Sequence, residues 1–151
     1  MFGLIPLVAI FVFFQLVISL TTVDDGKLTV AQADTAMIGQ SMLALHGFAA
    51  LYARQNPGYT GYATDTVLGS PSWYNRPSYV GSYLSGGKAY VYYNGPSSQG
   101  LPAYLVTTSG DIYGTGTNQS GVLASPSALP ADTASLQIPT QVPNGSVVVM
   151  P

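Results

Sequence analysis

The chain has 151 residues, which is room for one domain, and charged residues make up only 7% of it, where a typical soluble domain carries about 25%. This composition argues against a freely diffusing cytosolic protein. The four Lys and Arg residues are spread singly, so no basic stripe is available to bind a nucleic acid backbone. Because the chain contains no Cys, a disulfide framework and a thiolate zinc site are both excluded.

Residues 1–23 are predicted to form a transmembrane anchor, so the lipid bilayer is a predicted partner. The segment has no charged side chain and is nearly all apolar from Leu4 to Leu20, which at about 1.5 Å per residue spans a hydrocarbon core of about 30 Å. A cleaved signal peptide is the alternative, but no Lys or Arg precedes the apolar run and no Ala-x-Ala pattern follows it. We therefore expect a retained single-pass anchor, with the remainder of the chain translocated across the membrane.

Residues 28–55 are predicted to form an amphipathic helix. Apolar residues recur there at helical spacing, and the stripe of Met37, Met42, Leu45 and Phe48 is expected to cover a sheet. The helix is expected to end at Asn56-Pro57-Gly58, because a residue before Pro avoids the helical region and Gly tolerates the left-handed one.

A tyrosine-rich β region follows. Residues 59–75 are expected to be irregular, with Trp73-Tyr74 over the core, and residues 79–84 and 89–93 to form a hairpin across 85–88. A third strand is predicted at 103–108, turning at 109–111 into 112–114. Together with the helix, these strands predict an α+β fold in which the helix packs on a small antiparallel sheet.

The extracytoplasmic α+β domain is expected to cover residues 24–119, and residues 120–151 to form a Ser/Pro-rich segment. Pro interrupts this segment repeatedly, so much of 120–142 is predicted to be loop. Residues 144–149 are expected to add a final edge strand.

No catalytic, cofactor-binding or metal-binding residue is predicted. His46 is the one His and lies in an apolar helix without a visible partner, while Lys88 falls in the expected hairpin turn, where it is not prepared to act as a base. The carboxylates Asp65, Asp111 and Asp132 each stand in a turn-like context, and the chain has no Glu. Accordingly, no enzymatic activity and no cofactor are expected.

The working surface is instead predicted on the β region. One face of a small sheet must be covered by the helix, and the other face is expected to be free. Tyr90 and Tyr92 share a face, so they are core if they face the helix and an aromatic contact patch if they face outward. The candidate interaction residues are Tyr79, Tyr83, Tyr90, Tyr92 and Tyr104.

With this layout and the passage from Ala49 to Gly61, AALYARQNPGYTG, the chain resembles the small PilM proteins of type IVb and conjugative thin-pilus operons, which are unrelated to the actin-like protein of the same name. The resemblance implies a bacterial inner-membrane protein with its bulk in the periplasm. It also implies a place in the pilin transport apparatus or pilus basal body, with pilus assembly proteins or pilin as partners. That family has no known catalytic residues.

Two other functions remain open at this point. A minor pilin-like subunit also runs an apolar helix into an amphipathic one beneath a sheet, but it needs a charged leader and typically a Glu near the start of the mature helix, and only Met1-Phe2 precede Gly3 here. A cell-envelope binding or adhesion module would use exposed Tyr. A homo-oligomer is an open alternative as well, because a second copy would help a small domain to bury its surface.

Overall fold

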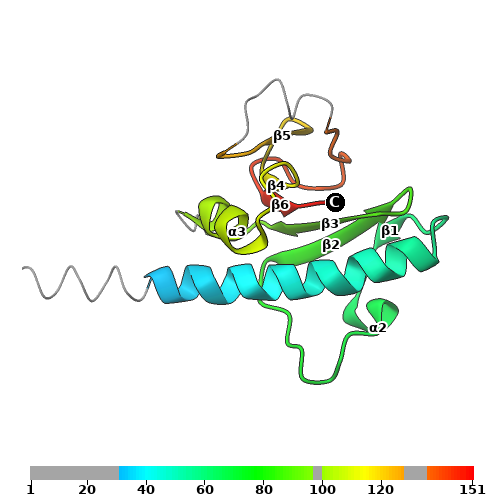
Figure 1. The fold of residues 1–151 in the computed structure, drawn as a ribbon. Helices are drawn as coiled ribbons and strands as arrows, with labels where there is room; N and C mark the ends of the chain where they lie inside the picture. The colour runs from blue at the N-terminus through cyan, green and yellow to red at the C-terminus, as the bar shows by residue number, and fades with distance from the viewer. Residues whose placement is uncertain (1–30, 97–99, 128–135) are drawn as a thin grey trace, which may run out of the picture. The chain divides into compact units, whose positions relative to one another are not determined.

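A computed structural model describes residues 31–96, 100–127 and 136–151 of the chain. Thr35–Pro151 form one compact unit, and Met1–Asp34 form a separate unit, of which only the last four residues are described. The predicted anchor at 1–23 and the predicted helix start at 28 lie outside the described residues. Within Thr35–Pro151 the architecture is α+β, with helices packed against an antiparallel sheet (Figure 1), which confirms the predicted fold class.

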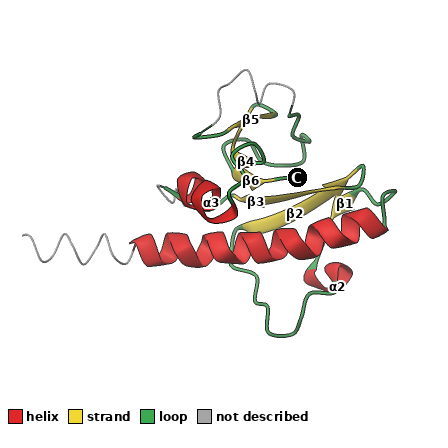
Figure 2. Cartoon of the chain, viewed as in Figure 1, coloured by secondary structure: helices red, strands yellow, loops and turns green. Residues whose placement is uncertain are grey.

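Among the described residues the sheet has six strands in the order β1-β2-β3-β6-β4-β5, and every neighbouring pair is antiparallel. The strands are β1 Gly61–Tyr62, β2 Val80–Ser85, β3 Lys88–Tyr93, β4 Thr115–Gln119, β5 Val122–Ala124 and β6 Val147–Val149. Two short helices join them, α2 Asp65–Leu68 and α3 Leu101–Ser109 (Figure 2).

The long helix Ala31–Gln55 ends at the predicted position. The amide of Asn56 still donates to the carbonyl of Tyr52, and Pro57 then prevents the next turn. By length and composition alone this helix could cross a membrane. In the compact unit, however, Met42, Leu45 and Ala49 on one face have no exposed surface, because they pack against the sheet.

One face of the sheet packs against the long helix and α3. Because side chains alternate along a strand, the same face receives Val80 and Leu84 of β2 and Ala89, Val91 and Tyr93 of β3. Leu101 and Leu105 of α3, four residues apart, join this cluster from the side. This is the larger of the two hydrophobic cores.

The other face is covered by the C-terminal part of the chain, so the expectation of a free second face is wrong. Tyr83 and Tyr90 are buried there, together with the apolar side chains Leu123, Ile138, Val142, Val148 and Met150. Asn118 fixes this cover, because its buried amide nitrogen donates to the carbonyl oxygens of Val142 (3.0 Å) and Pro143 (3.1 Å). Residues of the Ser/Pro-rich segment therefore form a second hydrophobic core together with the sheet.

The predicted hairpin is confirmed. Strands β2 and β3 pair from Val80↔Tyr93 to Ser85↔Lys88, and Gly86 and Gly87 form the turn. Their φ angles of 57° and 74° are both in the left-handed region, which two-residue hairpin turns of this kind require and glycine adopts without strain.

The predicted third strand at 103–108 is wrong, because these residues belong to helix α3. Tyr, Val and Thr in this segment favour a strand by propensity. The helix forms because Leu101 and Leu105 reach the core at helical spacing, Pro102 sits in the first turn, and Gly100 and Gly110 bracket the helix in left-handed conformations. The Gly-Leu-Pro start and the closing Gly are the signals that could have identified the helix.

Two further expectations about strands need correction. Residues 112–114 form a bend instead of a strand, because the Asp111 carboxylate accepts the amides of Tyr113 and Gly114 and holds them in a turn. The last strand, β6, is central and not at the edge, since it lies between β3 and β4. Its run of valines is buried on both faces of the sheet, and this makes it suited to a central position.

The segment 59–75 is more ordered than predicted. It contains the short edge strand β1, which pairs with Tyr83 and Leu84 of β2, and the single-turn helix α2, capped by the Thr64 hydroxyl and closed by Gly69. Tyr74 packs against the larger core as expected, whereas Trp73 beside it points away from the core and is 73% exposed.

Candidate interaction surface

Three of the five tyrosines proposed from the sequence lie together on the face covered by the C-terminal segment. Tyr83 and Tyr90 are directly opposite each other across β2 and β3, and each is only 6% exposed. Burial raises the pKa of Tyr90, so its phenol stays neutral well beyond physiological pH. These two side chains are core residues in the described structure.

Tyr92 is half-buried on the same face. It stands opposite Gly81, and its ring covers the position that a side chain would take there, so glycine is required for the ring to lie flat on β2. The pKa of Tyr92 is raised mainly by burial and further by Tyr62, while Arg76 acts in the opposite direction. Tyr92 thus lies at the margin of the second core.

The remaining two tyrosines lie elsewhere. Tyr79 is 62% exposed, and its ring packs edge-on against Tyr93 with 6.5 Å between the centroids. Tyr104 of α3 is half-buried, with its ring against the backbone of Gly39 in the long helix. The five tyrosines therefore do not form one continuous surface, and their contact with a partner stays a prediction.

The structure shows an exposed aromatic group that the sequence reasoning missed. Phe48 of the long helix packs edge-on against Tyr74 and Trp73, with ring centroids 5.6 Å and 6.3 Å away, and Trp73 and Tyr74 are themselves 6.3 Å apart. We call these three residues the aromatic triad. The fact that the chain's single Trp falls next to a Tyr in a Pro-rich loop is the sequence signal that could have found it.

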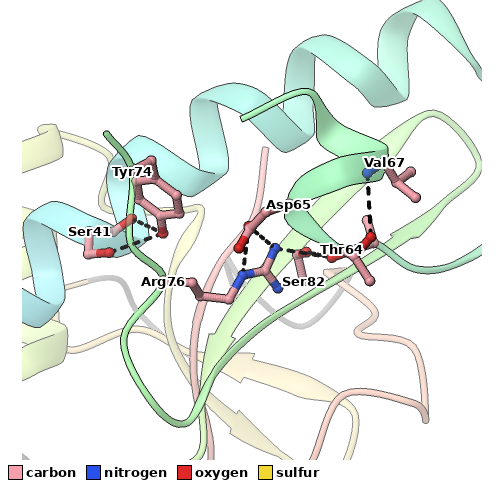
Figure 3. Close-up of polar contacts among 8 residues, drawn as sticks. Ser41, Thr64, Asp65, Val67, Tyr74, Arg76 and Ser82 are labelled. Atoms are coloured by element: carbon pink, nitrogen blue, oxygen red, sulfur yellow. Dashed lines mark hydrogen bonds and ion pairs between the residues drawn. The ribbon is translucent and has the colours of Figure 1, made fainter. Parts of the chain in front are cut away.

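Hydrogen bonds to the long helix hold the loop that carries Trp73. The Tyr74 hydroxyl donates to the Ser41 carbonyl at 3.1 Å, which leaves the Ser41 hydroxyl to donate to Tyr74 at 3.0 Å (Figure 3). Burial raises the pKa of Tyr74, so the phenol keeps the proton that it donates. These two bonds fix the residue next to Trp73.

An ion pair holds the same loop to α2, two residues after Tyr74. The Arg76 guanidinium donates from Nε at 2.9 Å and from Nη2 at 2.6 Å to Oδ1 of Asp65, and Nη2 also donates to the Ala63 carbonyl at 3.1 Å (Figure 3). The Ser82 hydroxyl of β2 donates to the same carbonyl at 2.8 Å. The loop between α2 and β2 is thus anchored at Tyr74 and Arg76, one and three residues after Trp73.

The described residues that could carry chemistry are engaged in structural roles or stand apart. Asp65 pairs with Arg76, Asp111 caps the turn after α3, and Lys88 is exposed at the hairpin turn. His46 is largely buried, and its Nε2 has no partner among the described atoms. No group of three metal-ligating side chains occurs in the part of the chain that the structure describes, and Lys27 and Asp132 lie outside it.

This arrangement is suited to binding another protein. Trp is the side chain most often found at the energetic centre of protein interfaces, because it buries much area and loses little conformational entropy. Here Trp73 is exposed, yet its backbone is held by neighbours that bond to the helix and to α2. Such a fixed aromatic side chain can be buried by a partner without a further cost of ordering the loop.

The comparisons with known proteins agree with the resemblance noted in the sequence. The PilM family model matches residues 10–150. A protein named PilM from Escherichia coli B7A has the same fold, with a TM-score of 0.57 at 20% identity. The aligned region covers 80% of this chain and 93% of that protein's chain. A protein named pilM from Pseudomonas aeruginosa 2192 matches with a TM-score of 0.48 at 26% identity, covering 78% of this chain and 94% of its own. No curated protein matches the chain closely enough to be reported as a relative.

Proposed function

The chain belongs to the PilM family, and from this we propose that it is a membrane-anchored structural component of type IV (thin) pilus assembly. It acts through protein–protein contacts in the pilin transport apparatus or pilus basal body, with pilus assembly proteins or pilin as partners. The observation that carries this proposal is the family match over residues 10–150, which is nearly the whole chain.

The proposal places residues 1–23 in the inner membrane and the bulk of the chain in the periplasm. The uncharged, apolar composition of this segment supports the anchor. Residues 24–119 and the Ser/Pro-rich segment 120–151 then stand on the periplasmic side. The second part contributes β5 and β6 to the same sheet, so its described residues belong to one compact unit with the described residues from Thr35 onward.

The aromatic triad is the proposed contact with the pilus machinery. Replacing Trp73 by Ala removes the exposed ring, and we expect pilus assembly to be lost in cells whose only copy carries this change. Trp73→Phe is the matched variant and should retain assembly, because it keeps an aromatic surface in the same place. Both proteins should unfold at the temperature of the parent chain, since Trp73 is 73% exposed.

Normal assembly with Trp73→Ala, at normal protein level, would show that the contact lies elsewhere. Crosslinking in cells, followed by identification of the captured proteins, tests the function itself. Capture of pilus assembly proteins or pilin supports the basal-body role, whereas capture of unrelated envelope proteins would favour the binding or adhesion module.

The anchor is tested by the intact mass of the protein extracted from membranes. The full 151 residues are expected, and protease added to spheroplasts should digest the chain beyond Lys27. Loss of about 20 N-terminal residues with the remainder soluble would exclude the anchor. Incorporation of a processed form into pilus filaments would instead identify a minor pilin-like subunit.

A further inference from the structure

The face of the long helix that points away from the sheet has an unusual composition. From Thr35 to Ala53 the helix carries no Asp, Glu, Lys or Arg, although most of its outward positions are in contact with solvent. Met37 is 60% exposed and Leu51 58% exposed, whereas the Met37 side chain was expected to cover the sheet. A surface helix normally has a charged outer face; this one has the exposed polar Gln40 but no charge, and an uncharged face with exposed large apolar side chains marks a contact.

The large and small residues of this face are arranged symmetrically along the helix. Ala44 stands in the middle, and Met37 and Leu51 lie seven residues before and after it, so all three share one side of the helix. Gly47 lies one turn beyond Ala44, and no atom of the described residues lies within 4 Å of a Cβ atom placed on it. We call Met37, Ala44, Gly47 and Leu51 the outer stripe. It is about 21 Å long, with small residues at its centre and large ones at its ends.

From this symmetry we propose that the outer stripe binds the outer stripe of a second copy of the chain, with the two helices antiparallel. A two-fold axis at Ala44 brings the small residues together, where the backbones can approach closely, and places Met37 of one copy beside Leu51 of the other. The residues of this interface are already at least partly exposed in the single chain. The proposal stands on the helix alone and does not depend on the pilus role.

Charge favours the antiparallel arrangement. Along the helix Ala31–Gln55, Asp34 and Arg54 each lie ten residues from Ala44. In an antiparallel pair each end carries an acidic residue of one copy and a basic residue of the other, and the helix dipoles are opposed. A parallel pair would instead place the two Arg54 side chains at one end and the two Asp34 side chains at the other. The like charges would then weaken the pair.

Single cysteines test the contact without interference, because the chain contains none. We expect Ala44→Cys in the full-length chain to form a disulfide-linked dimer in intact cells on mild oxidation. Gln119→Cys, exposed at the end of β4, is the matched control and should link at least ten times more slowly. Dimer formation by Ala44→Cys no faster than by this control would refute the proposal.

The direction of the pair is read from two further variants. Met37→Cys co-expressed with Leu51→Cys should give a mixed dimer, while each variant alone should link poorly. Equal self-linking by each variant alone would mean a parallel pair, which contradicts the antiparallel proposal.

A charge at the axis provides an independent measurement. Ala44→Arg should convert the purified full-length protein from dimer to monomer in sedimentation, with an unchanged far-ultraviolet circular dichroism spectrum, whereas Gln119→Arg should leave the dimer intact. A parent chain that sediments as a monomer, or an Ala44→Arg variant that stays dimeric, would refute the proposal.

Discussion

Gly39 is a point of close contact between the long helix and α3. A Cβ atom placed on Gly39 would stand 2.5 Å from Cδ1 of Tyr104, well inside the closest approach of two carbon atoms, whereas nothing lies within 4 Å of such an atom on Gly47. The two glycines of this helix therefore have different roles. The first permits a contact between helices, and the second faces open space.

This difference predicts opposite effects for the same substitution. Gly39→Ala should lower the free energy of unfolding by about 1–3 kcal/mol, because the Tyr104 ring must move. Gly47→Ala should raise it by up to about 1 kcal/mol, since Ala favours the helix. Urea unfolding of both variants, at a concentration where the chain is monomeric, measures the two values. Equal effects would mean that the Tyr104 ring yields freely.

His46 gives the domain a pH dependence with a defined sign. Burial lowers the pKa of His46 below its ordinary value of 6.5; nearby Asp111 opposes this effect, and Arg54 adds to it. The unfolded chain therefore takes up this proton at a higher pH than the folded chain does. The contribution of His46 to stability is fully present above pH 6.5 and is lost as the pH falls toward the lower folded pKa.

We expect the parent chain to lose stability between pH 7 and pH 5 more steeply than the His46→Gln variant. Thermal unfolding across this range measures the difference, and the comparison cancels the contribution of the carboxylates. Parallel curves would show that His46 takes up its proton equally in both states. Pilus assembly by His46→Gln should be unchanged, because no described partner prepares this side chain for catalysis.

At the scale of elements, a tyrosine inside the hairpin and one just outside it differ in burial. Tyr90 of β3 is buried beneath the C-terminal segment, and Tyr79, just before β2, is largely exposed. The same residue type therefore has two different roles within a short stretch of chain. Alternation along a strand shows which tyrosines share a face, but not what covers that face.

Substitution by Ser separates these roles. Tyr90→Ser should reduce the free energy of unfolding by about 3–5 kcal/mol, comparable to the loss of a buried Phe ring. Tyr79→Ser should cost less than about 1.5 kcal/mol, which is the scale of one edge-on aromatic pair. Denaturant unfolding gives both numbers. A small decrease in the free energy of unfolding for Tyr90→Ser would make Tyr90 a candidate contact residue again.

At the scale of the molecule, the chain's last strand holds the sheet together. β6 bonds to β3 on one side and to β4 on the other, so the N-terminal half, β1-β2-β3, meets the pair β4-β5 only through it within the sheet. Its side chains also enter both cores. A segment of three residues thus joins parts of the chain that are far apart in sequence.

A chain that ends at Ser146 should therefore not fold. Such a chain loses two rows of hydrogen bonds and the buried side chains of Val148 and Val149. The free energy that these interactions contribute exceeds the roughly 5–15 kcal/mol that stabilises a domain. Far-ultraviolet circular dichroism and proteolysis test this, with removal of the exposed Pro151 alone as the control. A cooperative unfolding transition in the truncated chain would contradict the central role of β6.

The sequence by itself determined the features that depend on neighbouring residues. The end of the long helix followed from Asn56-Pro57-Gly58, and the hairpin turn followed from Gly86-Gly87, because Pro and Gly restrict or widen the backbone conformations of their own segment. The resemblance to PilM likewise came from local residues and was confirmed by the family match.

Only the tertiary structure decided the features that depend on distant residues. Residues 101–109 carry local helix signals at both ends, but their neighbours favour a strand, and the contact of Leu101 and Leu105 with the core at helical spacing decided between the two. Likewise, β6 became central, Tyr90 became core and Trp73 became exposed according to which segment packed over each of them. Burial depends on what lies on the opposite side of a contact, and that partner is dozens of residues away in the chain.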